Sequence, residues 1–156
     1  MGLSIQLKGE PCFMMISTKG RYALKVMIDL AEHQSSGYIP LQTIADRQQI
    51  SEKYLETILR SMVQHGLLVG VRGKGGGYRL TRSPSEYSVG EILRLSEENL
   101  APVACLEHNA PECQQSADCR TLPIWIKLND MINKYLDSVS LADLLPPLEP
   151  GNDYVI

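Results

Sequence analysis

Residues 41–81 read LQTIADRQQISEKYLETILRSMVQHGLLVGVRGKGGGYRLT, and this stretch decides the fold. Apolar side chains recur every three or four positions in residues 41–47 and again in residues 52–65, which predicts two helices separated by a short turn. Ser51 is a good N-cap for the second helix, and Gly66 is a good stop for it. Two helices joined in this way are typical of a helix-turn-helix unit.

The next part of the same stretch predicts a β-hairpin. Residues 68–72 and 78–81 are rich in residues that favour strands, and the glycine-rich segment 73–77 separates them. A helix-turn-helix followed directly by a β-hairpin is a winged helix-turn-helix. The hairpin, or wing, carries basic residues at its tip, which is the first indication of a polyanionic partner.

The flanking sequence adds helices and no further strands. A helix is expected from about Lys19 to His33, a second from Ser88 to about Glu98, and a long one from about Leu122 to Ser138, followed by a short last turn. The expected fold class is therefore mainly α with a small β-hairpin, a winged helix-turn-helix plus a long C-terminal dimerisation helix. The expected organisation is an N-terminal tail (1–14), the winged helix-turn-helix DNA-binding domain (15–98), a cysteine-containing sensor loop (99–121), the dimerisation helix and terminal turn (122–145) and a C-terminal tail (146–156).

Charge is distributed unevenly along the 156 residues. Residues 15–82 hold ten basic and five acidic side chains, whereas residues 83–156 hold four basic and twelve acidic ones. This asymmetry indicates a half that faces a polyanion and a half that faces something else, although chance scatter is the alternative. No apolar run approaches the roughly 20 residues of a membrane span, and the start is a poor secretory signal. We therefore expect a cytoplasmic protein without a membrane partner.

The second helix of the helix-turn-helix carries the candidate base-reading residues. An α-helix fits the major groove, where the edges of the four base pairs differ. The expected DNA-contacting side chains on this helix are Ser51, Lys53, Tyr54, Glu56 and Arg60. Glu56 can accept a hydrogen bond from a cytosine amino group, and Arg60 is better suited to a phosphate. A merely solvated helix face is the alternative interpretation.

The wing favours DNA over that alternative. Arg72, Lys74, Gly75 and Gly76 form a slender basic tip, and such a tip can approach the minor groove, where arginine and lysine are attracted. A nucleotide-phosphate loop would need a helix directly after the glycines. The chain instead continues as a strand, so a phosphate loop is excluded.

The long C-terminal helix predicts self-association. Trp125, Leu128, Ile132 and Leu136 step by three or four residues along one face. Part of this stripe must pack on its own domain, but the helix is long and the domain is small. The part of the stripe that the domain cannot cover indicates a partner. The simplest partner is the same helix of a second chain, which would give a homodimer.

Three of the four cysteines cluster in the loop before this helix. Cys105, Cys113 and Cys119 are spaced C-x7-C-x5-C. In a chain without an export signal, metal or redox chemistry is expected before a disulfide framework. Three thiolates suit an iron–sulfur cluster or zinc, and a thiol switch without metal is a further possibility. The residues between the thiols leave four possible fourth ligands, namely Glu107, His108, Glu112 and Asp118.

Together these motifs resemble a known family. The segments that carry the resemblance are Ser17–Ala23 (STKGRYA), Ile50–Glu56 (ISEKYLE), Val71–Tyr78 (VRGKGGGY), Val89–Ile92 (VGEI) and Leu141–Leu144 (LADL). They are similar to those of the Rrf2 family of bacterial winged-helix transcription regulators, which includes IscR, NsrR and CymR. The resemblance covers roughly residues 15–145.

The resemblance implies a homodimer that binds a pseudo-palindromic operator in double-stranded DNA. It places Ser51, Lys53, Tyr54 and Glu56 at base-reading positions, and the three cysteines where cluster-binding members have their thiolate ligands. A [2Fe–2S] cluster is expected before a [4Fe–4S] cluster. IscR-type members have a histidine three residues after the third cysteine, where this chain has Leu122, so the fourth ligand stays unassigned.

The sequence thus predicts a non-enzymatic, DNA-binding transcription regulator of the repressor type that senses iron–sulfur or redox status. One alternative is a cluster-free regulator controlled by thiol oxidation or a partner protein. The other is an iron–sulfur redox protein. No nucleophile–base pair is visible, because the histidines at 33, 65 and 108 are scattered.

Overall fold

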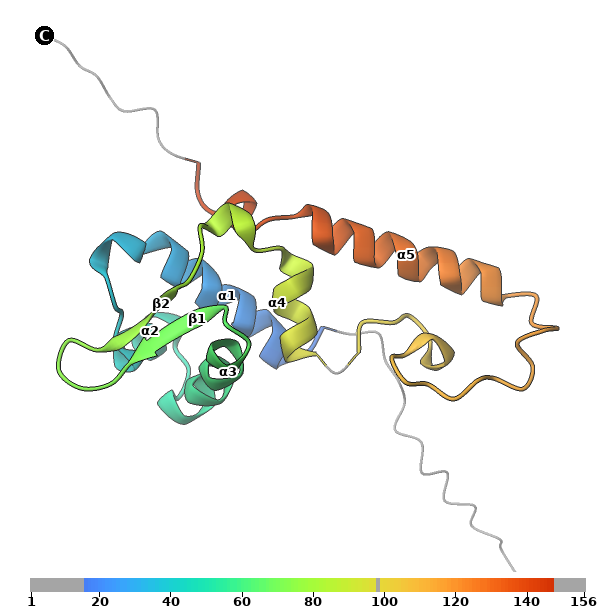
Figure 1. Ribbon diagram of the computed structural model, residues 1–156, viewed down its shortest axis with the longest axis horizontal. Coiled ribbons are helices and arrows are strands. Elements are labelled where there is room, and N and C mark those ends of the chain that lie inside the picture. Colours follow the sequence, from blue (N-terminus) through green and yellow to red (C-terminus); the bar gives the residue numbers. More distant parts are fainter. Residues whose placement is uncertain (1–15, 98, 148–156) are drawn as a thin grey trace, which may run out of the picture.

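The computed structural model describes residues 16–97 and 99–147 (Figure 1). The helices and strands of these residues are α1 (Thr18–Glu32), α2 (Leu41–Gln48), α3 (Glu52–Gln64), β1 (Leu68–Val71), β2 (Gly77–Leu80), α4 (Val89–Ser96) and α5 (Leu122–Ser138). Short 3-10 turns cover residues 34–36, 84–86, 104–106 and 142–144. The mainly helical class with one small hairpin is confirmed. The expected N-terminal tail and most of the expected C-terminal tail lie outside the described residues, and no helix in the described part is long and apolar enough to cross a membrane.

Serine residues define where three of the helices begin. Ser17, Ser51 and Ser88 precede α1, α3 and α4, and each Oγ accepts a hydrogen bond from the backbone N–H three residues later (3.1, 3.2 and 3.0 Å). Each cap satisfies one of the N–H groups that a helix start leaves unpaired, and is worth about 1 kcal/mol. The expected cap of α3 is confirmed, and α1 uses Ser17.

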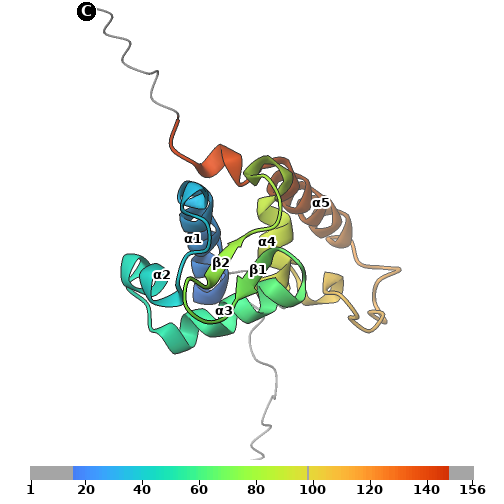
Figure 2. The same ribbon diagram turned by 60° about the vertical axis from the view of Figure 1, so that its left-hand side comes forward.

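The core lies between α1, α3, α4 and the hairpin (Figures 1 and 2). Side chains that are almost completely buried come from every one of these elements: Ala23, Val26, Met27, Leu30, Leu55, Ile58, Leu59, Met62, Leu68 and Ile92. Burial of each large member contributes about 1.5–3 kcal/mol. This core fixes the direction in which α3 presents its outer face.

The hairpin is held to the helical body by backbone pairing. In the antiparallel pair β1–β2, Leu68 lies opposite Leu80 and Gly70 lies opposite Tyr78. Tyr78 also exchanges two backbone hydrogen bonds with Ile39, from the segment before α2 (2.9 and 2.8 Å). A side chain on Gly77 would collide with the backbone of Ile39, so the glycine is required for this third pairing. The base of the wing is therefore fixed, and only the tip is open.

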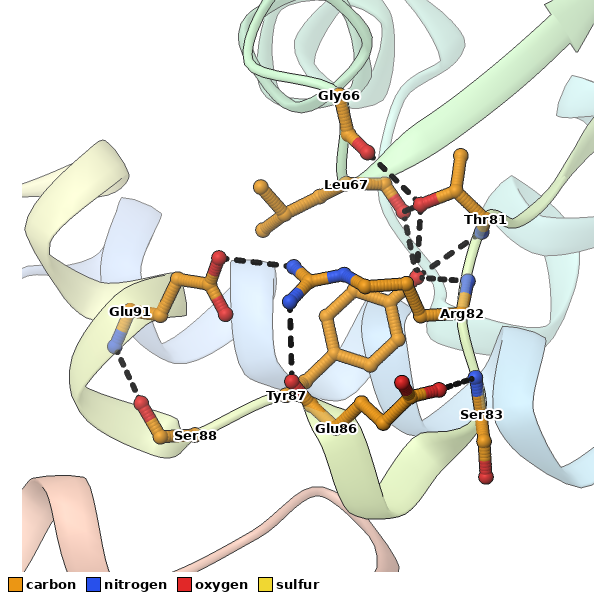
Figure 3. Close-up of polar contacts among 9 residues, drawn as sticks. All are labelled: Gly66, Leu67, Thr81, Arg82, Ser83, Glu86, Tyr87, Ser88 and Glu91. Carbon is orange, nitrogen blue, oxygen red and sulfur yellow. Dashed lines mark hydrogen bonds and ion pairs between the residues drawn. The ribbon is translucent and has the colours of Figure 1, made fainter.

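A buried tyrosine ties the base of the wing to α4 (Figure 3). The Tyr87 hydroxyl donates to the backbone oxygen of Leu67 (2.8 Å) and accepts from the N–H groups of Thr81 and Arg82 (both 2.9 Å). The Arg82 guanidinium lies over the Tyr87 ring and pairs with Glu91 of α4 (2.8 Å). These contacts join the strand ends to the helix that follows them.

We expect Tyr87→Phe to lower the free energy of unfolding by about 2 kcal/mol, because backbone groups of Leu67, Thr81 and Arg82 each lose a hydrogen bond while the ring still fills its space. Urea unfolding followed by circular dichroism measures the change. Tyr135→Phe is the matched control, since Tyr135 is 69% exposed, and it should change stability by less than about 0.5 kcal/mol. Equal effects of the two changes would contradict the expectation.

A second long-range contact joins the end of α4 to the start of α1. Glu97 Oε1 accepts from both the backbone N–H and the hydroxyl of Ser17 (2.9 and 2.8 Å). A Cβ atom on Gly20, one turn into α1, would overlap the Glu97 carboxylate. The carboxylate therefore occupies space that only a glycine leaves open.

Candidate nucleic-acid interface and cysteine loop

The outer face of α3 presents most of the predicted base-reading residues to solvent. Ser51, Lys53, Glu56 and Arg60 are exposed. Tyr54 is half-buried, and its ring meets the ring of Tyr22 from α1 edge to face, with centroids 6.0 Å apart. The remaining polar face of α3 therefore points outward beside an aromatic pair.

Two of the predicted DNA contacts are paired with each other in the free protein. Arg60 Nη2 lies 3.0 Å from Glu56 Oε1, one turn apart on α3, and both side chains are more than half exposed. An exposed pair of this kind contributes only a few tenths of a kcal/mol. Both groups are therefore available to a partner at little cost.

The wing and α3 enclose a groove between them. It has a volume of about 500 Å³, and its walls include Glu56, Arg60, Arg72 and Gly76. Arg72, Lys74 and Gly75 are exposed at the tip. The structure thus brings predicted residues of the helix and of the wing together on one side of the molecule.

Sequence reasoning missed the aromatic residues that support the basic side chains. Arg79 of β2 lies over the ring of Tyr38, at 4.7 Å from the ring centroid, and Lys25 of α1 lies 5.2 Å from the centroid of Tyr22. The available signal was the occurrence of tyrosines near basic residues, but their pairing depends on the tertiary fold.

The three loop cysteines line one pocket of about 280 Å³, whose wall also includes Glu112 and Leu122. Among the described residues, no three His, Cys, Asp or Glu side chains lie close enough together to hold a single metal ion. An iron–sulfur cluster distributes its ligands over two or more irons, so it does not need three side chains around one atom. The donor set and its common pocket therefore fit a cluster, although the loop must close for the thiols to bind it.

Cys119 differs from an isolated thiol because it lies at the start of α5. Its Sγ is 3.5 Å from the Thr121 hydroxyl. Hydrogen bonds from that hydroxyl and from the backbone N–H groups of Thr121 and Leu122 hold the pKa of Cys119 below its usual range. At a given pH, a larger fraction of Cys119 is therefore present as the reactive thiolate than for an unperturbed cysteine.

We expect the cluster-free protein to be alkylated by iodoacetamide at Cys119 with a pH midpoint below that of an unperturbed cysteine, because only the thiolate reacts. Thr121→Val removes the hydroxyl and should move the midpoint back to higher pH. Mass spectrometry of the digested protein after timed labelling measures the rate at each thiol. A midpoint that does not move in Thr121→Val would contradict the assigned cause.

Helix α5 has an apolar face that its own domain covers incompletely. Trp125, Leu128, Ile132 and Leu136, the predicted dimerisation residues, are half-buried, and no residue of α5 is buried. The face continues onto exposed side chains, which are Ile124 (59% exposed), Met131 (56%) and Tyr135 (69%). The stripe predicted from the sequence did not include Ile124 or Met131.

Polar contacts attach α5 to α4 beside this apolar face. Arg94 donates to both carboxylate oxygens of Asp137 (2.7 and 3.1 Å) and to the side-chain oxygen of Asn133 (2.9 Å). Figure 1 shows α5 extending away from the body of the molecule, with the cysteine loop at its far end and the wing at the opposite end. The uncovered face of α5 is therefore free to meet another molecule.

The arrangement of α2, α3 and the hairpin defines a winged-helix protein. A family model described as an iron-dependent transcriptional regulator, Rrf2, matches residues 16–147. The chain belongs to the Rrf2 family of transcriptional regulators, and the resemblance inferred from its motifs is confirmed. The relatives are named as regulators of transcription and not as enzymes, in agreement with the expectation from the sequence.

The chain is similar to proteins named IscR and CymR. It is 39% identical to the HTH-type transcriptional regulator IscR of Aliivibrio salmonicida over 132 residues, which cover 85% of this chain and 77% of that protein. Among solved structures, IscR of T. potens is 37% identical with a TM-score of 0.65, covering 83% of this chain and 84% of the other. CymR, the global cysteine regulator of B. subtilis, is 36% identical with a TM-score of 0.68, covering 83% and 95%.

Proposed function

We propose that this regulator acts as a homodimer that binds a pseudo-palindromic operator in double-stranded DNA. The observation that carries the proposal is the groove shared by α3 and the wing, with Glu56 and Arg60 on one wall and Arg72 and Gly76 on the other. In this arrangement α3 reads base edges in the major groove while the basic wing tip enters the adjacent minor groove. Binding takes place in the cytoplasm, with no membrane partner.

A second chain would fit the exposed face of α5. A twofold axis beside α5 would cover the exposed Ile124, Met131 and Tyr135 with the same residues of the partner. It would also present two copies of α3, as a site with two half-sites requires. The half-buried Trp125 and Ile132 would form the inner edge of the same interface.

We further propose that Cys105, Cys113 and Cys119 bind an iron–sulfur cluster, of the [2Fe–2S] type, whose occupancy changes DNA binding. The support is the single pocket lined by all three thiols and the match to a family described as iron-dependent. The cluster would supply one-electron and oxidant-sensitive chemistry, and the protein would respond by ordering or releasing the loop before α5.

A specific observation favours a second possibility, a thiol switch without a cluster. The lowered pKa of Cys119 is the property expected of a redox-sensing thiol, and all three loop thiols are free. Anaerobic purification distinguishes the two. A coloured, iron-containing protein supports the cluster, and a colourless, iron-free protein that still binds DNA supports the thiol switch.

Selection of bound duplexes from random DNA, followed by affinity measurements across a salt series, tests the DNA-binding proposal. Affinity should fall steeply with salt, because phosphate contacts release counterions. Arg72→Ala should weaken binding about tenfold, a loss expected for one wing contact. Lys134→Ala on α5, also an exposed cation, is the control and should change affinity less than about twofold. Affinity that does not depend on salt would rule the proposal out.

A further inference from the structure

The sequence leaves four residues of the cysteine loop as possible fourth ligands. The structure places only one of them beside the three thiols. Glu112 lies in the wall of the pocket that the three thiols share, whereas Glu107, His108 and Asp118 do not. His108 instead lines a different pocket of about 400 Å³, between the end of α4 and the side of α5. His108, one of the four possible ligands, is therefore not part of the wall around the thiols.

The position at which IscR-type members have a histidine lies in the same wall. Leu122 occupies it here, and its side chain lines the thiol pocket together with Ile126. Neither aliphatic side chain can donate an electron pair to iron. Apart from the thiols, the side chains of this wall that offer an oxygen are Glu112 and Ser116. Metal binding requires a deprotonated ligand, and a carboxylate reaches that state far more easily than a serine hydroxyl does.

We infer that the carboxylate of Glu112 is the fourth ligand of the cluster, in place of the histidine that Leu122 replaces. This inference rests on the proposed iron–sulfur function. It assigns three thiolates and one carboxylate oxygen from a single loop, so that one chain supplies the complete set. A carboxylate adds a negative charge where a neutral imidazole adds none, and greater negative charge at a cluster lowers its reduction potential.

Removal of the carboxylate tests the assignment. Glu112→Ala, reconstituted anaerobically, should lose its iron to a chelator at least about tenfold faster than the wild type, because even ligand-supporting groups change metal affinity by this amount. Its visible absorption and the electron paramagnetic resonance of its reduced form should also change. Glu112→Gln, which keeps the size of the side chain, should show the same direction of change. Asp118→Ala removes an equal charge next to Cys119 and should leave iron release and spectra as in the wild type.

A rescue variant makes the test independent of loop stability. Leu122→His in the Glu112→Ala background offers an imidazole from the same wall. It should restore slow iron release and give a reduction potential higher than that of the wild-type cluster. Circular dichroism should show the Glu112 variants folded, because Glu112 is exposed and outside the helices, and it checks that Leu122→His, at the first residue of α5, keeps that helix.

The outcomes separate the inference from the function on which it rests. A wild-type protein that never retains iron anaerobically removes both the cluster and its fourth ligand, while DNA binding is unaffected. A wild type that holds a cluster, with iron release and spectra unchanged in Glu112→Ala, overturns the inference alone. Changed spectra in Ser116→Ala or His108→Ala, with Glu112→Ala unchanged, would assign the ligand to that other residue and overturn it as well.

Discussion

The double change Ile124→Glu and Tyr135→Glu is expected to convert the proposed dimer into monomers and to lower affinity for a two-half-site operator at least about 100-fold. Both side chains are more than half exposed on α5, so glutamate is tolerated in the separate chain. In a twofold interface each glutamate would meet apolar surface and the partner's added charge. The loss of affinity follows because two linked half-sites gain a factor of about 100 or more from effective concentration.

Sedimentation equilibrium and fluorescence anisotropy with operator DNA measure the two effects. Lys134→Glu introduces the same residue on an exposed, polar side of α5 and should leave both properties near those of the wild type. The circular dichroism of the double variant should match that of the parent chain. A double variant that stays dimeric would exclude this face of α5 as the interface.

The change Arg47→Met is expected to lower the free energy of unfolding by about 3 kcal/mol, near the lower end of the range for breaking a buried ion pair. Asp29 of α1 is only 3% exposed, and Arg47 of α2 donates two hydrogen bonds to its carboxylate (2.9 and 2.6 Å). Gln48 donates a third (2.9 Å). Methionine fills similar space but leaves the buried carboxylate with only the Gln48 amide and the more distant His33 ring nitrogen (3.7 Å). The loss of stability should lie at this lower end because Arg47 is itself one-third exposed.

Urea unfolding measures this loss, and a double variant tests its cause. Asp29→Asn combined with Arg47→Met removes the charge together with its partner, so it should be more stable than Arg47→Met alone. If the double variant is less stable than the wild type by the sum of the two single effects, the two residues are not coupled. The predicted loss would then have another origin.

Local signals were sufficient to predict the fold from the sequence. Ser51 and Ser88 mark helix starts because a cap acts within three residues, and the glycines of 73–77 mark a hairpin turn because strand-forming residues lie on both sides of them. The long helix was predicted with both ends as observed, Leu122 and Ser138, because its apolar period continues without interruption. These signals depend on neighbours along the chain, and the sequence displays such neighbours directly.

The contacts that orient these elements could not be predicted in the same way. Glu97 bonds to Ser17, 80 positions earlier, and Arg94 bonds to Asp137, 43 positions later. Nothing in the local pattern selects these partners from the other charged residues. The same holds for the Tyr87 hydroxyl, because three of its four partners are backbone groups, which carry no residue signature.

The candidate site, too, could be predicted only in part from the sequence. Residue types identified the exposed face of α3, the basic wing and the three cysteines. Sequence alone could not choose between Glu112 and His108, because residues four apart in an irregular loop have no fixed relation in space. Nor could it show that Ile124 and Met131 widen the apolar face of α5, since burial depends on what α4 covers.

The close approach of Glu97 to Gly20 has a consequence for how this protein can diverge. The carboxylate fills the volume that any larger residue at position 20 would require. A larger residue at position 20 would push the end of the Glu97 side chain aside and cost its two hydrogen bonds to Ser17. The two positions are distant in the gene, yet a change at one removes the advantage of the residue at the other, so we expect them to vary together among descendants.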